Sequence, residues 1–411
     1  MNFDNLKENS GVYLYQDEGF NTITLKLNFL GRTDNRSCAI SDVLSYYMLL
    51  SNKNFEDDVA INQRKKELYE LQCHFINKFY SRQKVFSLYA NFVSPAVLND
   101  DYYKDVFEFI RQILKEPDFT NEELLDYCKR SILSNLELQF TDNEEYADSK
   151  YNEVVLGEEN RVYEYSTDMD YITELINSIT LDELKDAYEY IMSHFQSGIV
   201  FGNISEDKFN EFVSTMSLPP RVKDVHYERD INPPTGDEEI IRDSEQSYIY
   251  VTYDMGHVSY PQLRLLLNIL NSSLGLCYQT LREQHGLVYS SYAAIMYYLN
   301  KIYFYGEIDP SKKQEYLDAV EEIVSKLQDR ESLETAINNS KIQLGIRELT
   351  ISENQDEVVD SLDDYALGLY EGQNRNEIFQ EIADTTVDDI LTSTMQLKRR
   401  HVLMVRSGED E

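Results

Sequence analysis

The chain has 411 residues, enough for two or three domains, and 42% of them are hydrophobic, so a substantial core can form. Its 38 Lys and Arg against 74 Asp and Glu give a formal net charge of −36, which disfavours nucleic acid and anionic membranes as partners. This charge either favours basic or neutral peptides as partners or serves only solubility.

The first twenty residues lack the basic and apolar regions of a secretory signal, and no apolar run is long enough to span a membrane. We therefore expect a cytoplasmic protein. The four cysteines have neither zinc-site nor redox-motif spacing, so we expect them to be buried thiols: Cys38, Cys73, Cys128 and Cys277.

The first half begins with a strongly alternating segment, NTITLKLNFLG, at residues 21–31. It predicts a half-buried strand with two faces, Ile23, Leu25, Leu27 and Phe29 on one and Thr24, Lys26 and Asn28 on the other. Hydrophobic periodicity then predicts a helix at 39–51, a strand at 85–93, a helix through 106–114 and a long helical stretch over 120–148.

Four of the eight prolines fall between Pro219 and Pro234, in a charged segment without periodicity. This composition predicts a linker at 218–240 between domains at 1–217 and 241–411. The second half then repeats the order of the first. Its predicted elements are a strand at 247–255, a helix at 260–282, a hairpin of strands at 286–296 and 301–308, a helix through 317–327 and a long helix at 331–353.

The ends of the two halves match best. A helix that begins with a capping-box pattern precedes a strand in each, with Thr180 and Glu183 in one and Thr386 and Asp389 in the other. We therefore predict an α+β protein of two homologous α/β domains, each with an antiparallel-rich sheet packed with helices. The alternative is that two unrelated α+β domains share this order.

One block of the second half, Ile269 to Leu327, contains LREQHGLVYSS, then an aromatic strand to Gly306, and Asp309-Pro310 before an amphipathic helix. It resembles the C-terminal domain of the pitrilysin/insulinase-type metallopeptidases, the inverzincins, to which the mitochondrial processing peptidase is related. The resemblance implies two homologous domains that form half of a clam-shell dimer around a peptide-sized chamber.

In that family one wall of the chamber binds zinc through the two His of H-x-x-E-H and a later Glu. The Glu of the motif activates the water for metal-assisted hydrolysis. The opposite wall carries an Arg and a Tyr that contact the substrate near the cleaved bond, and Arg282 and Tyr289 fall on this pair. A guanidinium and a phenol are suitable donors for an oxyanion. The alternative is that Arg282 only caps a helix and Tyr289 is an ordinary strand tyrosine.

None of the six histidines belongs to an H-x-x-E-H motif. The overlay with the family puts Asp42, Ser45 and Tyr46 at the motif positions and Asn135 at the downstream Glu, whereas a one-residue shift gives Val43, Tyr46 and Tyr47. Neither set suits zinc, which takes imidazole, thiolate or carboxylate ligands. We therefore expect a degenerate site, with no metal bound by this chain.

The chain thus resembles the non-catalytic subunit of heterodimeric bacterial processing peptidases. The resemblance implies a related H-x-x-E-H partner that holds the zinc and a peptide substrate, such as a leader or bacteriocin-type peptide. The alternative is a non-proteolytic peptide-binding or scaffold protein of the same fold. A third possibility, an independent enzyme, has little support, since the sequence lacks a G-x-S-x-G motif, a Cys/His constellation and a phosphate-binding loop.

Overall fold

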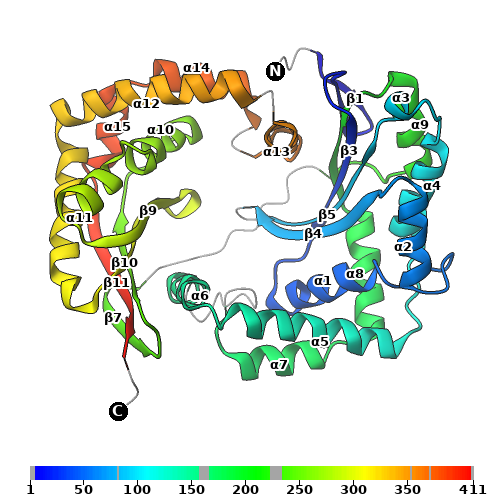
Figure 1. The fold of residues 1–411 in the computed structure, drawn as a ribbon, viewed down its shortest axis with the longest axis horizontal. Coiled ribbons are helices and arrows are strands. Elements are labelled where there is room, and N and C mark those ends of the chain that lie inside the picture. Colours follow the sequence, from blue (N-terminus) through cyan, green and yellow to red (C-terminus); the bar gives the residue numbers. More distant parts are fainter. Residues whose placement is uncertain are drawn as a thin grey trace. The chain divides into compact units, whose positions relative to one another are not determined.

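Two β-sheets organise the chain (Figure 1). Their strand orders correspond when the additional edge strand of the first sheet, β1, is left out. The computed structural model describes residues 5–80, 83–156, 166–222, 234–351, 354–369 and 372–408. These residues form two compact units, the first built mainly from the N-terminal half and the second mainly from the C-terminal half.

The first unit contains a six-stranded sheet in the order β1-β2-β6-β3-β5-β4. Its strands are β1 Lys7–Asn9, β2 Val12–Gln16, β3 Thr22–Gly31, β4 Gln72–Tyr80, β5 Gln83–Val93 and β6 Phe195–Gly202. Its helices are α1 Asn35–Tyr47, α2 Asp58–Glu67, α3 Pro95–Leu98, α4 Tyr103–Lys115, α5 Glu122–Gln139, α7 Met169–Asn177, α8 Leu181–Ser193, α9 Glu206–Met216 and α13 Gln355–Ala366.

The second unit contains a five-stranded sheet in the order β7-β11-β8-β10-β9. Its strands are β7 Gly236–Arg242, β8 Ser247–Asp254, β9 Val288–Met296, β10 Lys301–Ile308 and β11 Lys398–Ser407. Its α-helices are α6 Asn143–Leu156, α10 Tyr260–Asn271, α11 Lys313–Gln328, α12 Arg330–Ile351, α14 Arg375–Asp384 and α15 Val387–Thr394, and a π-helical turn, η4, spans Tyr278–Gln284.

The two sheets confirm the predicted duplication. Without β1, each sheet begins with a parallel pair, β2 with β6 and β7 with β11, and continues through three antiparallel pairings. In this correspondence β3 matches β8, β5 matches β10, and the edge strand β4 matches the edge strand β9. Both predicted capping boxes are also present, at Thr180 and Thr386.

Each unit takes one helix from the other half of the chain. Helix α13 packs in the first unit on Ile199 and Phe201 of β6, and α6 packs in the second unit on Tyr250 and Leu403. The compact units are therefore not two continuous segments. Division into domains at 1–217 and 241–411 stays a prediction; most of the predicted linker, 223–233, lies outside the described residues, and its last residues begin β7.

Three other predictions need correction. The predicted helix at 260–282 ends at Asn271, and the separate π-helical turn η4 begins at Tyr278. The predicted helix at 120–148 is two helices, α5 and α6, and α6 belongs to the second unit. Strand β3 is not half-buried, since Thr24, Lys26 and Asn28 on its polar face are at most 4% exposed. Asp363 of α13 contacts both Lys26 and Asn28, so a helix from the far end of the chain covers this face. The four cysteines are buried free thiols, as predicted.

Candidate functional site

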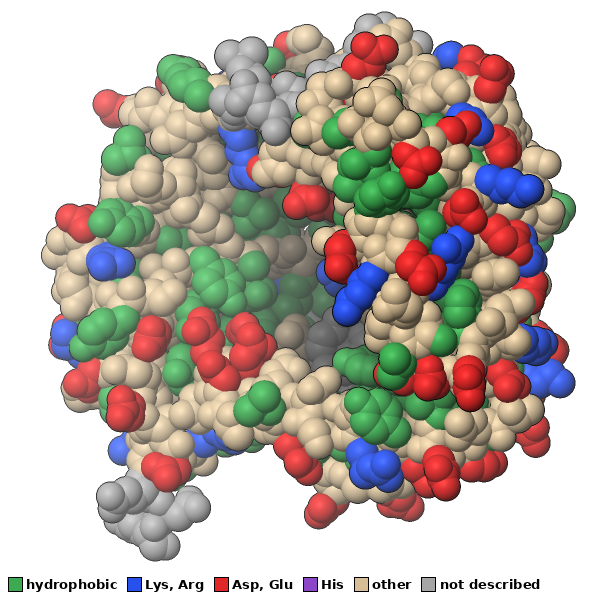
Figure 2. Space-filling view, turned by 45° about the vertical axis from the view of Figure 1, so that its right-hand side comes forward, with side chains coloured by type: hydrophobic (Ala, Val, Ile, Leu, Met, Phe, Trp, Pro, Cys, Tyr) green, Lys and Arg blue, Asp and Glu red, His purple; other side chains and the backbone are tan. Residues whose placement is uncertain are grey.

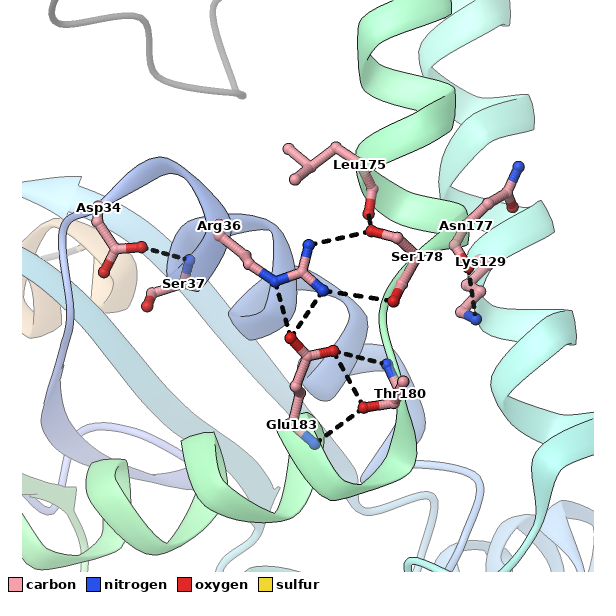
Figure 3. A network of polar contacts seen from close by, with 9 residues as sticks. All are labelled: Asp34, Arg36, Ser37, Lys129, Leu175, Asn177, Ser178, Thr180 and Glu183. Atoms are coloured by element: carbon pink, nitrogen blue, oxygen red, sulfur yellow. Dashed lines mark hydrogen bonds and ion pairs between the residues drawn. The ribbon is translucent and has the colours of Figure 1, made fainter.

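Helix α1 carries the positions of the predicted degenerate zinc site, and polar contacts hold its first turn. The carboxylate of Asp34 accepts a hydrogen bond from the Ser37 amide at 3.0 Å and caps the helix. Arg36 donates from Nε to Glu183 Oε1 at 2.7 Å and from Nη1 to Ser178 Oγ at 3.0 Å (Figure 3). Since Glu183 also belongs to the capping box of α8, α1 is anchored to the turn between α7 and α8.

Asp42 and Ser45 lie one turn apart on α1, and both are engaged by neighbouring protein groups. Asp42 Oδ1 accepts a hydrogen bond from Asn77 Nδ2 of β4 at 2.6 Å. Burial raises the pKa of the Asp42 carboxyl, while the nearby Lys84 ammonium and the Asn77 hydrogen bond offset part of that rise. Ser45 Oγ donates to the Asp42 backbone oxygen at 2.7 Å. One oxygen of the Asp42 carboxylate and the hydroxyl hydrogen of Ser45 are therefore already paired within the protein.

The structure brings the third α1 position together with the predicted downstream position. Asn135 Nδ2 of α5 donates a hydrogen bond to Tyr46 Oη at 3.2 Å. In the shifted register, Val43 is fully buried and Tyr47 Oη donates to the Asp118 backbone oxygen at 2.8 Å. The first register therefore groups Tyr46 with Asn135, whereas the two residues found only in the second register, Val43 and Tyr47, lie in the core.

The residues of this site do not fit zinc. They offer one carboxyl, a hydroxyl, a phenol and an amide, whereas structural and catalytic zinc sites require several imidazole, thiolate or carboxylate ligands. Within the described ranges, no group of three or more His, Cys, Asp or Glu side chains could hold a metal ion. A buried Lys84 beside Asp42 further disfavours a divalent cation.

Arg282 and Tyr289 lie together in the second unit, on the connection from η4 to β9. Arg282 Nη1 donates to the backbone oxygen of Tyr289 at 3.4 Å, and its guanidinium lies 5.6 Å from the Tyr278 ring centroid. Gly286 makes the sharp turn between them with φ of +61°, a conformation that favours glycine. Both side chains are exposed, Tyr289 by 68%. The guanidinium and the phenol can therefore present donors to a ligand.

Strand β9, which follows Arg282, is an edge strand of its sheet in the part of the chain that the structure describes. The Asn271 side chain pairs with it at one residue: Nδ2 donates to the Ala293 oxygen at 2.7 Å, and the Ala293 amide donates to Oδ1 at 2.8 Å. This pairing occupies the outward backbone groups of Ala293. An added peptide strand would have to pair elsewhere along β9.

Residues 178–343 match the protein family described as the peptidase M16 inactive domain. This part of the chain is thus similar to an M16 inactive-type domain. The match contains both Arg282 and Tyr289 and confirms the resemblance to the pitrilysin/insulinase-type family. Comparison of the sequence with curated proteins found no match.

Solved structures share the M16 fold with this chain. A conserved protein from Enterococcus faecalis V583 superposes with a TM-score of 0.83 at 17% identity, over 98% of each chain. A peptidase M16 inactive domain from Pseudomonas fluorescens gives 0.76 at 14% identity, over 99% of each chain. An M16-like peptidase from Alicyclobacillus acidocaldarius gives 0.71 at 14% identity, over 97% of this chain and 96% of that one. At these identities the likeness establishes the fold. Among the described residues, no helix combines the length and the apolar character needed to cross a membrane.

Proposed function

We propose that this chain is the catalytically silent, substrate-binding subunit of a heterodimeric zinc peptidase. One contrast carries the proposal. The residues that the family overlay puts at the zinc-site positions form a set that does not fit zinc, whereas Arg282 and Tyr289 lie side by side with exposed donors. The partner would be a related H-x-x-E-H chain that holds the zinc, and the complex would work in the cytoplasm.

The proposed roles of Arg282 and Tyr289 follow from their chemistry. Hydrolysis of a peptide bond develops negative charge on the carbonyl oxygen, and preorganised donors stabilise that charge in the transition state. A guanidinium offers two parallel N–H donors, and a phenol adds one O–H. Zinc on the partner would supply the Lewis acid and the activated water. The present chain would bind and orient the carbonyl oxygen.

We further propose that the substrate is an extended peptide that pairs with a sheet edge. Edge strands offer unpaired backbone groups, and peptides use them by strand addition. Both β4, whose Asn77 contacts α1, and β9, which follows Arg282, are edge strands in the described part of the chain. Figure 2 shows Asp and Glu side chains spread over the visible face, with Lys and Arg among them. With the net charge of −36, such a surface favours basic or unstructured segments, including leader or bacteriocin-type peptides.

The deciding experiment measures zinc content and peptidase activity for this chain alone, for a candidate H-x-x-E-H partner alone, and for their mixture. We expect no zinc and no cleavage for this chain alone, and faster cleavage by the mixture than by the partner alone. A one-to-one complex on a sizing column should accompany that activity. Stoichiometric zinc or cleavage by the lone chain would contradict the proposal. Complex formation without added activity would support the scaffold alternative instead.

A further inference from the structure

The segment that presents Arg282 is held along one side of helix α11 by three polar side chains. Lys326 Nζ donates to Thr280 Oγ1 at 3.0 Å, at the start of the segment. Lys312 Nζ, just before α11, donates to the Gly286 backbone oxygen at 3.4 Å, at its end. Glu322 lies between these two contacts and binds the residues that directly follow Arg282 and Glu283.

Glu322 is the centre of this clamp. Its carboxylate accepts hydrogen bonds from Gln284 Nε2 at 3.2 Å and from His285 Nε2 at 3.0 Å, and it pairs with Lys326 Nζ at 2.7 Å. These donors, Lys326 first and His285 second, lower the pKa of Glu322 to about 2. The carboxylate is therefore ionised at neutral pH and holds two consecutive side chains of the segment.

The backbone conformation of the segment that Glu322 contacts is unusual. Residues 278–284 form a π-helical turn, and the His285 amide donates to the Thr280 oxygen five residues earlier at 3.2 Å. Such wide turns are rare in proteins, occur mostly as single turns and are frequent at functional sites. Buried Thr280 and Leu281 anchor the first part of the turn in the core, whereas residues 282–286 are exposed. In the exposed part the Gly286 amide donates to the Arg282 oxygen at 3.1 Å, and Glu322 adds contacts to the side chains of Gln284 and His285.

We propose that Glu322 is a positioning residue for Arg282. By holding Gln284 and His285, it keeps the π-turn in the form that places the guanidinium beside Tyr289. The role of Glu322 in substrate binding rests on the function proposed above, whereas its contacts with the π-turn do not depend on that function. The simpler reading, a surface ion cluster that only adds local stability to α11, predicts a different pattern of changes.

The first test is amide hydrogen exchange of the full-length chain, followed by mass spectrometry of peptides that cover 278–290 and α11. We expect Glu322→Ala to speed exchange in 280–289 about tenfold or more while α11 keeps its protection. Glu322→Gln, which retains an oxygen acceptor, should lie between the wild type and Glu322→Ala. The matched control is Glu315→Ala, an exposed acid on the same helix, which should leave 280–289 unchanged. Equal exchange in the wild type and Glu322→Ala, or loss of protection confined to α11, would overturn the proposal.

The second test uses turnover of the assembled complex. If Glu322 acts through Arg282, Glu322→Ala should lower kcat/KM about tenfold alone and add nothing in an Arg282→Ala background, because coupled residues are not additive. Full additivity would overturn the positioning role. Faster exchange at 280–289 combined with normal turnover of Arg282→Ala would leave the clamp standing and reject the proposed function. The two failures are therefore distinguishable.

Discussion

Replacing Asp363 of α13 by Asn should destabilise the first unit by about 3–5 kcal/mol, the range for breaking a buried ion pair. Asp363 forms an ion pair with Lys26 of β3, and the two side chains are only 2% and 5% exposed. The substitution keeps the shape of the side chain but removes its charge. The Lys26 ammonium would then remain in the interior without its ion-paired carboxylate, and Asp360 of α13 would be left as a weaker electrostatic partner.

A double substitution tests the same reasoning in the opposite direction. In Lys26→Met with Asp363→Leu, no charge is left buried, so the main cost disappears. Asn28 loses the hydrogen bond that it donates to Asp363 at 2.6 Å, but it still donates to Ser197 Oγ at 3.1 Å and accepts from Ser87 Oγ at 2.6 Å. The double variant should therefore lose about 1–3 kcal/mol, less than Lys26→Met alone or Asp363→Leu alone.

Urea unfolding measures these differences if the signal reports on the first unit. The chain contains no Trp, so Phe20→Trp, in the cluster that α13 helps to form, gives a single local fluorophore as the common background. Lys7→Met is the matched control. It breaks an ion pair with Glu206 whose side chains are 45% and 54% exposed, and it should cost less than about 1 kcal/mol. A loss below about 1 kcal/mol for Asp363→Asn, or additive losses in the double variant, would refute the assigned role of the pair.

Three further outcomes are expected. Arg282→Ala should lower turnover of the assembled complex about 10²-fold, and Tyr289→Phe should lower it less, with assembly on a sizing column unchanged; wild-type rates in both would reject their role. Burial lowers the pKa of His401, so unfolding takes up a proton and the free energy of unfolding should fall as pH drops below about 6.5. His401→Gln should flatten this pH dependence, and equal slopes of unfolding free energy against pH in the two proteins would contradict the prediction. The M16 zinc site is rebuilt with Asp42→His, Tyr46→His and Asn135→Glu as ligands and Ser45→Glu as the catalytic Glu. This variant should bind zinc only weakly until Lys84→Met is added, and equal affinity in competition titrations with and without Lys84 would contradict that.

Local signals in the sequence predicted most elements of the fold. The hairpin of β9 and β10 and the two capping boxes depend on residues close in the chain, and all three are present. The break between α5 and α6 also had a local signal. Asp142 accepts hydrogen bonds from the Glu144 and Glu145 amides, so TDNEE is a helix start inside what the apolar pattern predicts as one helix.

The burial of the polar face of β3 could not be predicted locally. Alternation along a strand shows which side chains share a face, but it does not show what covers that face. The covering residue, Asp363, lies 337 positions from Lys26 in the sequence. The same limit applies to the π-turn, because its conformation depends on Glu322, 37 residues beyond His285. Long-range polar contacts decide both cases.

The two candidate sites differ in where their hydrogen-bonding groups are directed. On α1, Asp42 accepts a hydrogen bond from Asn77, and Tyr46 accepts one from Asn135, so these polar groups are already paired within the protein. At the second site, Arg282 donates a long bond of 3.4 Å to a backbone oxygen, and Tyr289 is largely exposed. Donors that face solvent can exchange water for a substrate oxygen, whereas donors already paired inside the protein must first give up a partner. Binding experiments should therefore use variants of the turn between η4 and β9. Variants of α1 should lower stability more than they lower substrate binding.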